Sequence, residues 1–404
     1  MPGLPVVKPP VLKKGDTIGI IAPASPLADW SYLARGIKFL HRQGYRVRPG
    51  EYLEQLLRDG VTAPAPPGRA APPAAVNLSP AGNAGDHPGP GPETGLNPGV
   101  NAAQHPGAMA AATLIGAAPL EGQPDHPPAM EAAAVMAAAH APRCPAYLAG
   151  SDAGRLAELH CMFCDPEVRA IICLRGGYGS LRLLAGIDYH LIRSHPKILV
   201  GYSDITALHL AANKLAGLVT FHGPMIYPEL GGEEVPAYTQ ENLWSAITAA
   251  SPPGSIPPLA GLPPVTIVPG RAAGTLTGGN LSLITATLGT PLEIDTQGKI
   301  LFLEEVDEAP YRIDRMLTQL RLAGKLEAAA GIVFGRCSGC EDAVAGSTPL
   351  EVIAGIIAPL SIPCFYGLPA GHLAPQATLP LGVNALLDAT AGTLTLLEAA
   401  VAPA

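Results

Sequence analysis

The feature of this 404-residue chain that most constrains its fold is the alternation of short apolar runs with segments of helical periodicity. Runs such as Thr17-Ile-Gly-Ile-Ile-Ala22 and Ala170-Ile-Ile-Cys-Leu174 have the length and composition of buried strands. Between the first strands, residues 29–42 place apolar side chains on one helical face. Strands that alternate with helices pair in parallel, and the helices cover both faces of the sheet. The first part of the chain therefore predicts a doubly wound parallel α/β domain.

Two domains are predicted. Residues 1–230 form the parallel-sheet domain, and residues 231–264 are punctuated by proline and glycine around one expected helix, which is typical of a linker. Residues 265–404 form a second domain, in which the apolar run Ile300-Leu-Phe-Leu303 is a buried strand. We expect residues 378–387 and 392–397 to be its last two strands.

A segment of 83 residues, 63–145, interrupts the first domain. It holds 17 of the chain's 45 prolines and contains no Phe, Tyr, Trp or Lys. Such a segment cannot bury enough apolar surface to offset the entropy that it would lose on ordering. We predict a disordered insertion rich in Pro, Ala and Gly. A frameshifted stretch of gene is the alternative explanation of this composition.

Composition limits the partners and the compartment. The net charge of −8 argues against nucleic acid, which needs a basic surface. No apolar stretch reaches the roughly 18 residues of a membrane span, and Met1-Pro-Gly-Leu-Pro5 does not begin a signal-peptide pattern. Seven cysteines without a disulfide spacing indicate a reducing environment, so we expect a cytoplasmic protein.

Two Cys-x-x-Cys pairs, Cys161/Cys164 and Cys337/Cys340, could together supply four zinc ligands. More than 170 residues separate the pairs, which is far beyond the usual spacing of a zinc ribbon. We therefore expect buried free cysteines and no metal site.

Ser203 falls at a turn that could expose a nucleophile. The run Ile198-Leu-Val200 is an expected strand and residues 204–213 are an expected helix, so Ser203 lies between them. There its hydroxyl would stand clear of the backbone, beside the free amides of the first helical turn. The alternative is that Ser203 only caps the helix, because serine is a preferred N-cap residue.

A serine nucleophile needs a base, and the base needs an acid that orients it. The second domain offers both. Glu304 follows the strand at 300–303, with Glu305 beside it as an alternative acid, and His372 lies in a loop next to Gly371, which allows a close approach to another segment. Taken singly, the two acids could be a solvated strand end, and His372 could be a surface histidine.

A glycine-rich turn, Arg175-Gly-Gly-Tyr-Gly179, follows another expected strand. It lacks the Gly-x-Gly-x-x-Gly register of a dinucleotide site and is not a Walker A motif. It fits better as a donor to an oxyanion, together with the amide of Asp204, the residue after Ser203. The alternative is a tight turn that needs glycine only for its backbone angles.

In combination, these residues resemble the LD-carboxypeptidase family of serine peptidases, which includes the microcin C immunity peptidases. The matching stretches cover roughly residues 1–50 and 147–404, and their order is highly specific. They are Gly15–Ser25, Tyr147–Asp152, Arg175–Gly179, Gly201–Thr206, His222–Met225, Gly278–Ser282, Leu303–Val306, Tyr311–Leu317 and Gly367–His372.

The resemblance implies a triad of Ser203, Glu304 and His372, with the backbone of Gly177 and Asp204 as the oxyanion hole. It also implies a C-terminal swivelling β/β/α domain, a homodimer, and neither a metal nor a cofactor. The implied reaction is hydrolysis of the amide between an L-centred diamino acid and the terminal D-Ala of a murein tetrapeptide, a step of peptidoglycan recycling. Cleavage of peptidyl- or aminoacyl-nucleotides, as in the immunity peptidases, is the alternative. A catalytically silent binding protein on the same fold is a third hypothesis.

Overall fold

The fold is that of a computed structural model, which describes residues 4–58, 144–341 and 346–403. All of these described residues belong to one structural unit. The predicted insertion, 63–145, lies outside the described residues except for its last two positions. Among the described residues, no helix has both the length and the apolar character that a membrane span requires.

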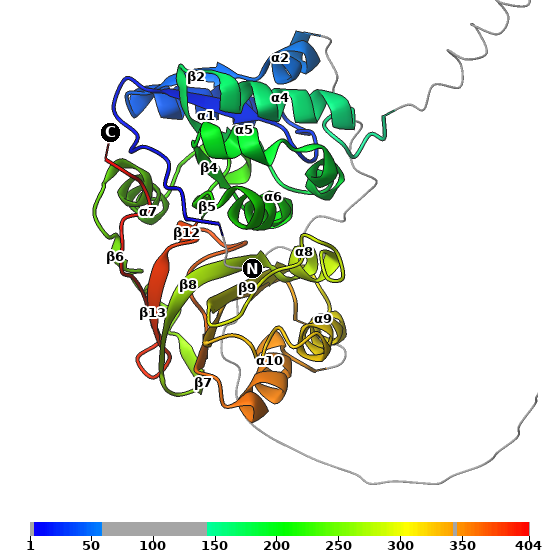
Figure 1. The fold of residues 1–404 in the computed structure, drawn as a ribbon, viewed down its shortest axis with the longest axis vertical. Helices are drawn as coiled ribbons and strands as arrows, with labels where there is room; N and C mark the ends of the chain where they lie inside the picture. The colour runs from blue at the N-terminus through cyan, green and yellow to red at the C-terminus, as the bar shows by residue number, and fades with distance from the viewer. Residues whose placement is uncertain (1–3, 59–143, 342–345, 404) are drawn as a thin grey trace, which may run out of the picture. The chain divides into compact units, whose positions relative to one another are not determined.

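Six strands form the first sheet, in the order β12-β5-β4-β3-β1-β2 (Figure 1). The five strands from the N-terminal part of the chain run parallel, as predicted, and β12 is antiparallel to its neighbour β5. The strands are β1 Thr17–Ile21, β2 Arg46–Pro49, β3 Val168–Cys173, β4 Ile198–Gly201, β5 Thr220–His222 and β12 Leu379–Leu381.

Helices cover both faces of this sheet. Ile20 of β1 packs in a core shared with α1 and α7, whereas the next residue, Ile21, packs in a second core shared with α4 and α6. Because successive side chains of a strand point to opposite faces, this alternation is the doubly wound arrangement that the sequence predicts. The helices are α1 Ser31–Arg42, α2 Glu51–Arg58, α4 Asp152–Cys164, α5 Tyr189–Ser194, α6 Thr206–Ala211 and α7 Ala237–Thr248, with short 3-10 or π segments η1 Ser180–Gly186, η2 Ser203–Ile205, η3 Ala212–Ala216 and η4 Ile226–Leu230.

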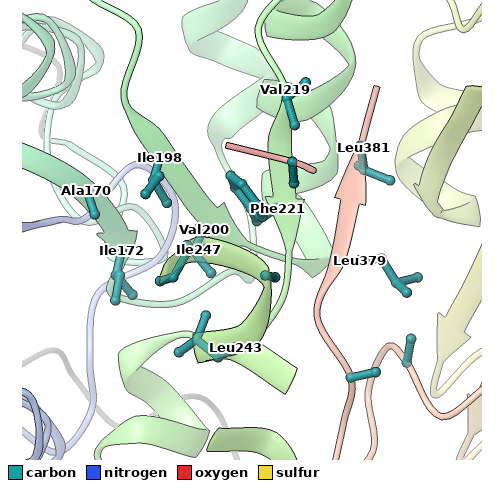
Figure 2. Close-up of a cluster of buried hydrophobic side chains, with 14 of the residues drawn as sticks. Ala170, Ile172, Ile198, Val200, Val219, Phe221, Leu243, Ile247, Leu379 and Leu381 are labelled. Atoms are coloured by element: carbon teal, nitrogen blue, oxygen red, sulfur yellow. The ribbon is translucent and has the colours of Figure 1, made fainter. Parts of the chain in front are cut away.

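Strand β12 joins the first sheet although it comes from the C-terminal part of the chain. Its Leu379 and Leu381 are fully buried and share a core with Phe221 (Figure 2). The prediction of one strand over residues 378–387 was therefore wrong, because this segment forms two strands in two sheets. The chain changes sheets at Gly382, whose φ of 98° is a conformation that glycine adopts without strain.

Eight strands form the second sheet, in the order β6-β14-β13-β8-β9-β10-β11-β7. Strands β8 to β11 run parallel, and antiparallel strands flank them on each side. Helices α8, α9 and α10 bury Ile284, Leu317 and Ile353 in one core with Leu301 and Phe334 of the sheet. The elements are β6 Gly254–Ser255, β7 Val265–Val268, β8 Arg271–Asn280, α8 Leu281–Ala286, β9 Ile300–Val306, α9 Pro310–Leu322, β10 Gly331–Ser338, α10 Pro349–Ile357, η5 Ala358–Leu360, β11 Cys364–Tyr366, β13 Asn384–Asp388 and β14 Thr393–Leu396.

The predicted linker, 231–264, packs a helix against the first sheet and adds a strand to the second. Leu243 and Ile247 of α7 are buried in the core of the first sheet, and β6 pairs with β14 of the second. The segment is thus packed along part of its length, and the domain boundaries stay a prediction.

Candidate active site

Ser203 stands at a sharp turn between strand β4 and helix α6. The backbone is extended at Tyr202 and then left-handed at Ser203, whose φ is 64°. A non-glycine residue in this region costs about 1–3 kcal/mol, and such strain is concentrated at functional sites. In the described chain, neither η2 nor α6 begins with a side-chain capping bond. The Ser203 hydroxyl is therefore not used as a helix cap.

Three side chains form a continuous line of hydrogen bonds. The Nε2 of His372 lies 2.9 Å from the Oγ of Ser203, and the Nδ1 of His372 lies 2.7 Å from the Oε2 of Glu304. The Glu304 side chain is fully buried in β9, whereas that of His372, in the loop between β11 and β12, is 18% exposed. The serine, acid and base expected from the sequence are thus brought together from three separate segments.

Gly371 allows the histidine loop to reach β9. Its φ is 102°, and a Cβ at this position would lie 2.7 Å from the Oε2 of Glu304. The amide of His372 also donates to the same oxygen, at 3.3 Å. A side chain at position 371 would push the loop away from the acid, so the close approach expected for this glycine is present.

Glu305 has different partners from Glu304. Its carboxylate accepts a hydrogen bond from the Nδ2 of Asn280 at 2.9 Å. It also accepts from the amide of Ser282 at 2.9 Å and from its hydroxyl at 2.7 Å. Adjacent residues of a strand point to opposite faces, so only one of the two acids can face His372. Both acids are buried, and neither is a solvated strand end.

The electrostatics of the His372–Glu304 pair favour the charged acid. Burial opposes charge on the His372 ring, but the charge and hydrogen bond of Glu304 outweigh it and raise the pKa of His372 above its usual value. Burial also acts to raise the pKa of Glu304, but His372 outweighs this effect and holds that pKa below its usual value. A ring that takes up a proton at Nε2 is therefore stabilised here.

The glycine-rich turn lies against Ser203. A Cβ on Gly176 would lie 3.1 Å from the Oγ of Ser203 and 3.3 Å from the amide nitrogen of Asp204. The carbonyl of Gly176 accepts from the amide of Ser25 at 3.3 Å. Because the N–H and C=O of a trans peptide point in opposite directions, the amide of Gly177 points away from Ser25. The turn therefore directs this amide away from Ser25, and the role of the amide as an oxyanion donor stays a prediction.

Two buried side chains that the sequence analysis did not identify hold the turn in place. The carboxylate of Asp204 accepts from the amide of Ser180 at 2.8 Å, and Arg155 donates to the carbonyl of Gly179 at 3.0 Å. Arg155 is fully buried on the same face of α4 as Leu159, four residues later. A charged residue on an apolar helical stripe was the signal that could have identified it.

The two Cys-x-x-Cys pairs differ in burial. Cys337 and Cys340 are buried free thiols, as expected, but Cys161 and Cys164 are exposed, so the expectation of burial was wrong for this pair. The buried face of α4 is formed by other residues, such as Phe163, and leaves both thiols on the solvent side. Within the part of the chain that the structure describes, no cluster of three or more His, Cys, Asp or Glu side chains could hold a metal ion.

Family models match two parts of the chain. That of the LD-carboxypeptidase N-terminal domain matches residues 124–223, and that of the C-terminal domain matches residues 273–387. A probable murein peptide carboxypeptidase of Bacillus subtilis (strain 168) is 47% identical over 259 residues, which span 63% of this chain and 79% of that protein. The chain belongs to the LD-carboxypeptidase family. The family resemblance that the motifs indicated is confirmed. This LD-carboxypeptidase is therefore an enzyme of the serine carboxypeptidase class.

Another relative and two solved structures are similar to this chain over most of its length. The murein tetrapeptide carboxypeptidase of Pseudomonas aeruginosa is 34% identical over 251 residues, which span 60% of this chain and 80% of that protein. The solved muramoyltetrapeptide carboxypeptidase of Oxalobacter formigenes has a TM-score of 0.64 at 26% identity and covers 94% of this chain and 97% of its own. The microcin C7 self-immunity protein MccF, solved without ligand, has a TM-score of 0.69 at 21% identity and covers 98% and 100%. The two-domain LD-carboxypeptidase fold is thereby confirmed.

Proposed function

We propose that this LD-carboxypeptidase releases the terminal D-Ala of a murein tetrapeptide by cleaving its amide bond to the L-centre of a diamino acid. The observation that carries the proposal is the unbroken line of hydrogen bonds from Glu304 through His372 to Ser203. Two relatives, a probable murein peptide carboxypeptidase and a murein tetrapeptide carboxypeptidase, support the choice of substrate.

In the proposed reaction, the Oγ of Ser203 attacks the peptide carbonyl carbon while the Nε2 of His372 takes its proton. Glu304 accepts a hydrogen bond from Nδ1–H, which leaves Nε2 free to act as the base. The amides of Gly177 and Asp204 bind the oxyanion. His372 then gives its proton to the nitrogen of D-Ala, the C–N bond breaks, and an acyl-enzyme remains. Water, deprotonated by the same histidine, attacks the ester carbon, and His372 returns the proton to the Oγ of Ser203 as the C–Oγ bond breaks.

A second candidate function is cleavage of peptidyl- or aminoacyl-nucleotides. Tyr147 and Tyr178 are both exposed and form an edge-to-face pair with ring centroids 5.4 Å apart. Tyr178 directly follows Gly177, so the pair offers an aromatic surface near the proposed oxyanion amides. Aromatic side chains of this kind stack on nucleobases. MccF, which has been solved in complex with glutamyl sulfamoyl guanosine, has the same fold.

The setting that we propose is peptidoglycan recycling in the cytoplasm. All seven cysteines are free thiols, which supports a reducing compartment. The homodimer implied by the resemblance stays a prediction, which sedimentation of the purified protein would test.

One comparison tests the function. Purified protein is given a murein tetrapeptide and, separately, a peptidyl-adenylate, and release of D-Ala or of the nucleotide is followed, with Ser203→Ala as the control. We expect D-Ala release from the tetrapeptide that the control lacks. Faster cleavage of the adenylate would favour the second candidate. Turnover of neither compound would favour the binding-protein hypothesis and overturn both enzymatic ones.

A further inference from the structure

Arg175 places a positive charge at the start of the glycine-rich turn. Its Nη1 donates to the carbonyl oxygen of Pro26 at 3.1 Å, and its guanidinium carbon lies 5.1 Å from the centre of the Tyr227 ring. Its Nε is buried, and no acceptor for it is found in the described structure. The side chain is therefore held in one place by neutral groups, while part of its fork of N–H donors has no partner.

The absence of an anion distinguishes Arg175, which is partly buried, from the fully buried Arg155 nearby. Arg155 pairs with the carboxylate of Asp152 at 2.6 Å. No carboxylate of the described residues forms such a pair with Arg175. Buried charged groups are normally paired, because burial without a partner is costly. Burial lowers the pKa of Arg175, yet a guanidinium remains charged at neutral pH. This position is therefore suited to a negatively charged ligand.

The turn brings this charge close to the nucleophile. The Nη2 of Arg175 lies 3.5 Å from the position that a Cβ on Gly177 would take, and a Cβ on Gly176 would lie 3.1 Å from the Oγ of Ser203. In a carboxypeptidase substrate, only the amide nitrogen and one Cα separate the reacting carbonyl carbon from the terminal carboxylate carbon. These two carbons are less than about 4 Å apart, given standard backbone dimensions. A cation that recognises the carboxylate must therefore lie near the nucleophile, and Arg175 directly precedes Gly176, the residue of the turn that lies against Ser203.

We propose that Arg175 binds the terminal carboxylate of the peptide substrate and thereby restricts cleavage to the last peptide bond. The inference rests on the proposed function and names the substrate group that the site selects. The planar guanidinium fork matches the two oxygens of a carboxylate, and the Tyr227 ring and the Pro26 carbonyl hold the fork in position. A peptide that continued beyond the scissile bond would place a neutral amide here and leave the charge without its anion.

The experiment uses two substrates that differ only in this group: a murein tetrapeptide that ends in D-Ala, and the same peptide that ends in D-alaninamide. Initial rates give kcat/KM for the wild type, Arg175→Met, Arg175→Lys and a control, Arg169→Met, which removes an exposed arginine of the preceding strand. Removing one member of a buried charged pair lowers kcat/KM for the acid by roughly 10²-fold or more. We expect that loss for Arg175→Met on the acid and a much smaller loss on the amide, so that the acid-to-amide preference collapses. Arg169→Met keeps the wild-type preference.

The result that overturns the inference is a folded Arg175→Met protein that keeps the wild-type preference for the acid over the amide. If Arg175→Met does not fold, Arg175→Lys decides. It keeps the charge but loses the planar fork, so we expect the preference to fall by about 10-fold, and an unchanged preference overturns the inference. If the wild type releases D-Ala but either variant keeps the preference for the acid, the role of Arg175 is rejected and the proposed function still holds. A wild-type protein that cleaves neither peptide overturns the function itself.

Discussion

The Nε2 of His372 lies 2.9 Å from the Oγ of Ser203, although 169 positions of the chain separate the two residues. Ser203 belongs to the turn after a strand of the first sheet, and His372 belongs to a loop that leaves the second sheet. The same loop continues into β12, which returns to the first sheet beside β5. The base and the nucleophile are therefore held together by the segment that connects the two sheets.

The strained turn at Ser203 predicts that two inactive variants differ in stability. Ser203→Ala and Ser203→Gly both remove the nucleophile, so each should lower kcat for D-Ala release by at least about 10⁴-fold. Only glycine adopts a φ of 64° without strain. The free energy of unfolding of Ser203→Gly should therefore exceed that of Ser203→Ala by about 1 kcal/mol, and its Tm should be higher. Turnover assays and thermal denaturation check both effects. Near-wild-type turnover of the alanine variant would refute the assignment of the nucleophile.

The two neighbouring acids should respond differently to the same substitution. Glu304→Gln keeps the shape of the side chain but removes the charge that orients His372, and we expect kcat to fall by roughly 10⁴-fold with the fold retained. Glu305→Gln disturbs the bonds to Ser282 and Asn280, so it should lower Tm while most of kcat remains. Steady-state kinetics and melting curves on the pair check this. Equal losses of kcat would contradict the proposed division of roles.

The pKa of His372 determines the acidic side of the pH profile. Burial opposes protonation of its ring, but Glu304 outweighs burial and raises that pKa above the usual value of a histidine. The proposed base must be neutral to take the serine proton, so kcat/KM should fall as the pH drops through a midpoint above that usual value. In Glu304→Gln this raising influence is gone and the midpoint should move to lower pH. A kcat/KM profile of both proteins checks the shift, and an unmoved or raised midpoint would argue against His372 as the titrating group.

Gly177 should tolerate no side chain. Its φ is 104°, and a Cβ there would lie 2.5 Å from the Oγ of Ser25, so Gly177→Ala must displace the turn and its amide. Loss of one oxyanion donor lowers kcat by about 10²–10³-fold. The matched control is Gly324→Ala, where φ is 67° but no atom lies within 4 Å of the added Cβ. It should carry the backbone strain alone and keep wild-type kcat. If both variants turned over at the wild-type rate, the turn would have no part in catalysis.

Much of the fold could be predicted because central parallel strands are buried on both faces and appear as unbroken apolar runs. Strands β1 and β3 are of this kind. No such signal marks the change of sheet at Gly382, because Leu379 and Leu381 would fill a strand of either sheet equally well. The exposure of Cys161 and Cys164 depends on which face of α4 the first sheet covers. Neighbouring elements decide that, and the helix's own sequence does not.

The sequence by itself determined which local turns could carry chemistry: a serine between a strand and a helix, a glycine before a histidine, and a glycine-rich turn after a strand. These are properties of adjacent residues, and adjacent residues are enough to predict them. The local residues left Glu304 and Glu305 as alternatives and the family resemblance favoured Glu304, but only the tertiary structure shows Glu304 bonded to His372 and Glu305 bonded elsewhere. Only the tertiary structure, likewise, shows that Arg175 has no carboxylate of the described chain beside it. Hydrogen bonds of 2.7–2.9 Å and the lack of a counter-charge depend on which distant segments meet, and that follows from how the two sheets pack.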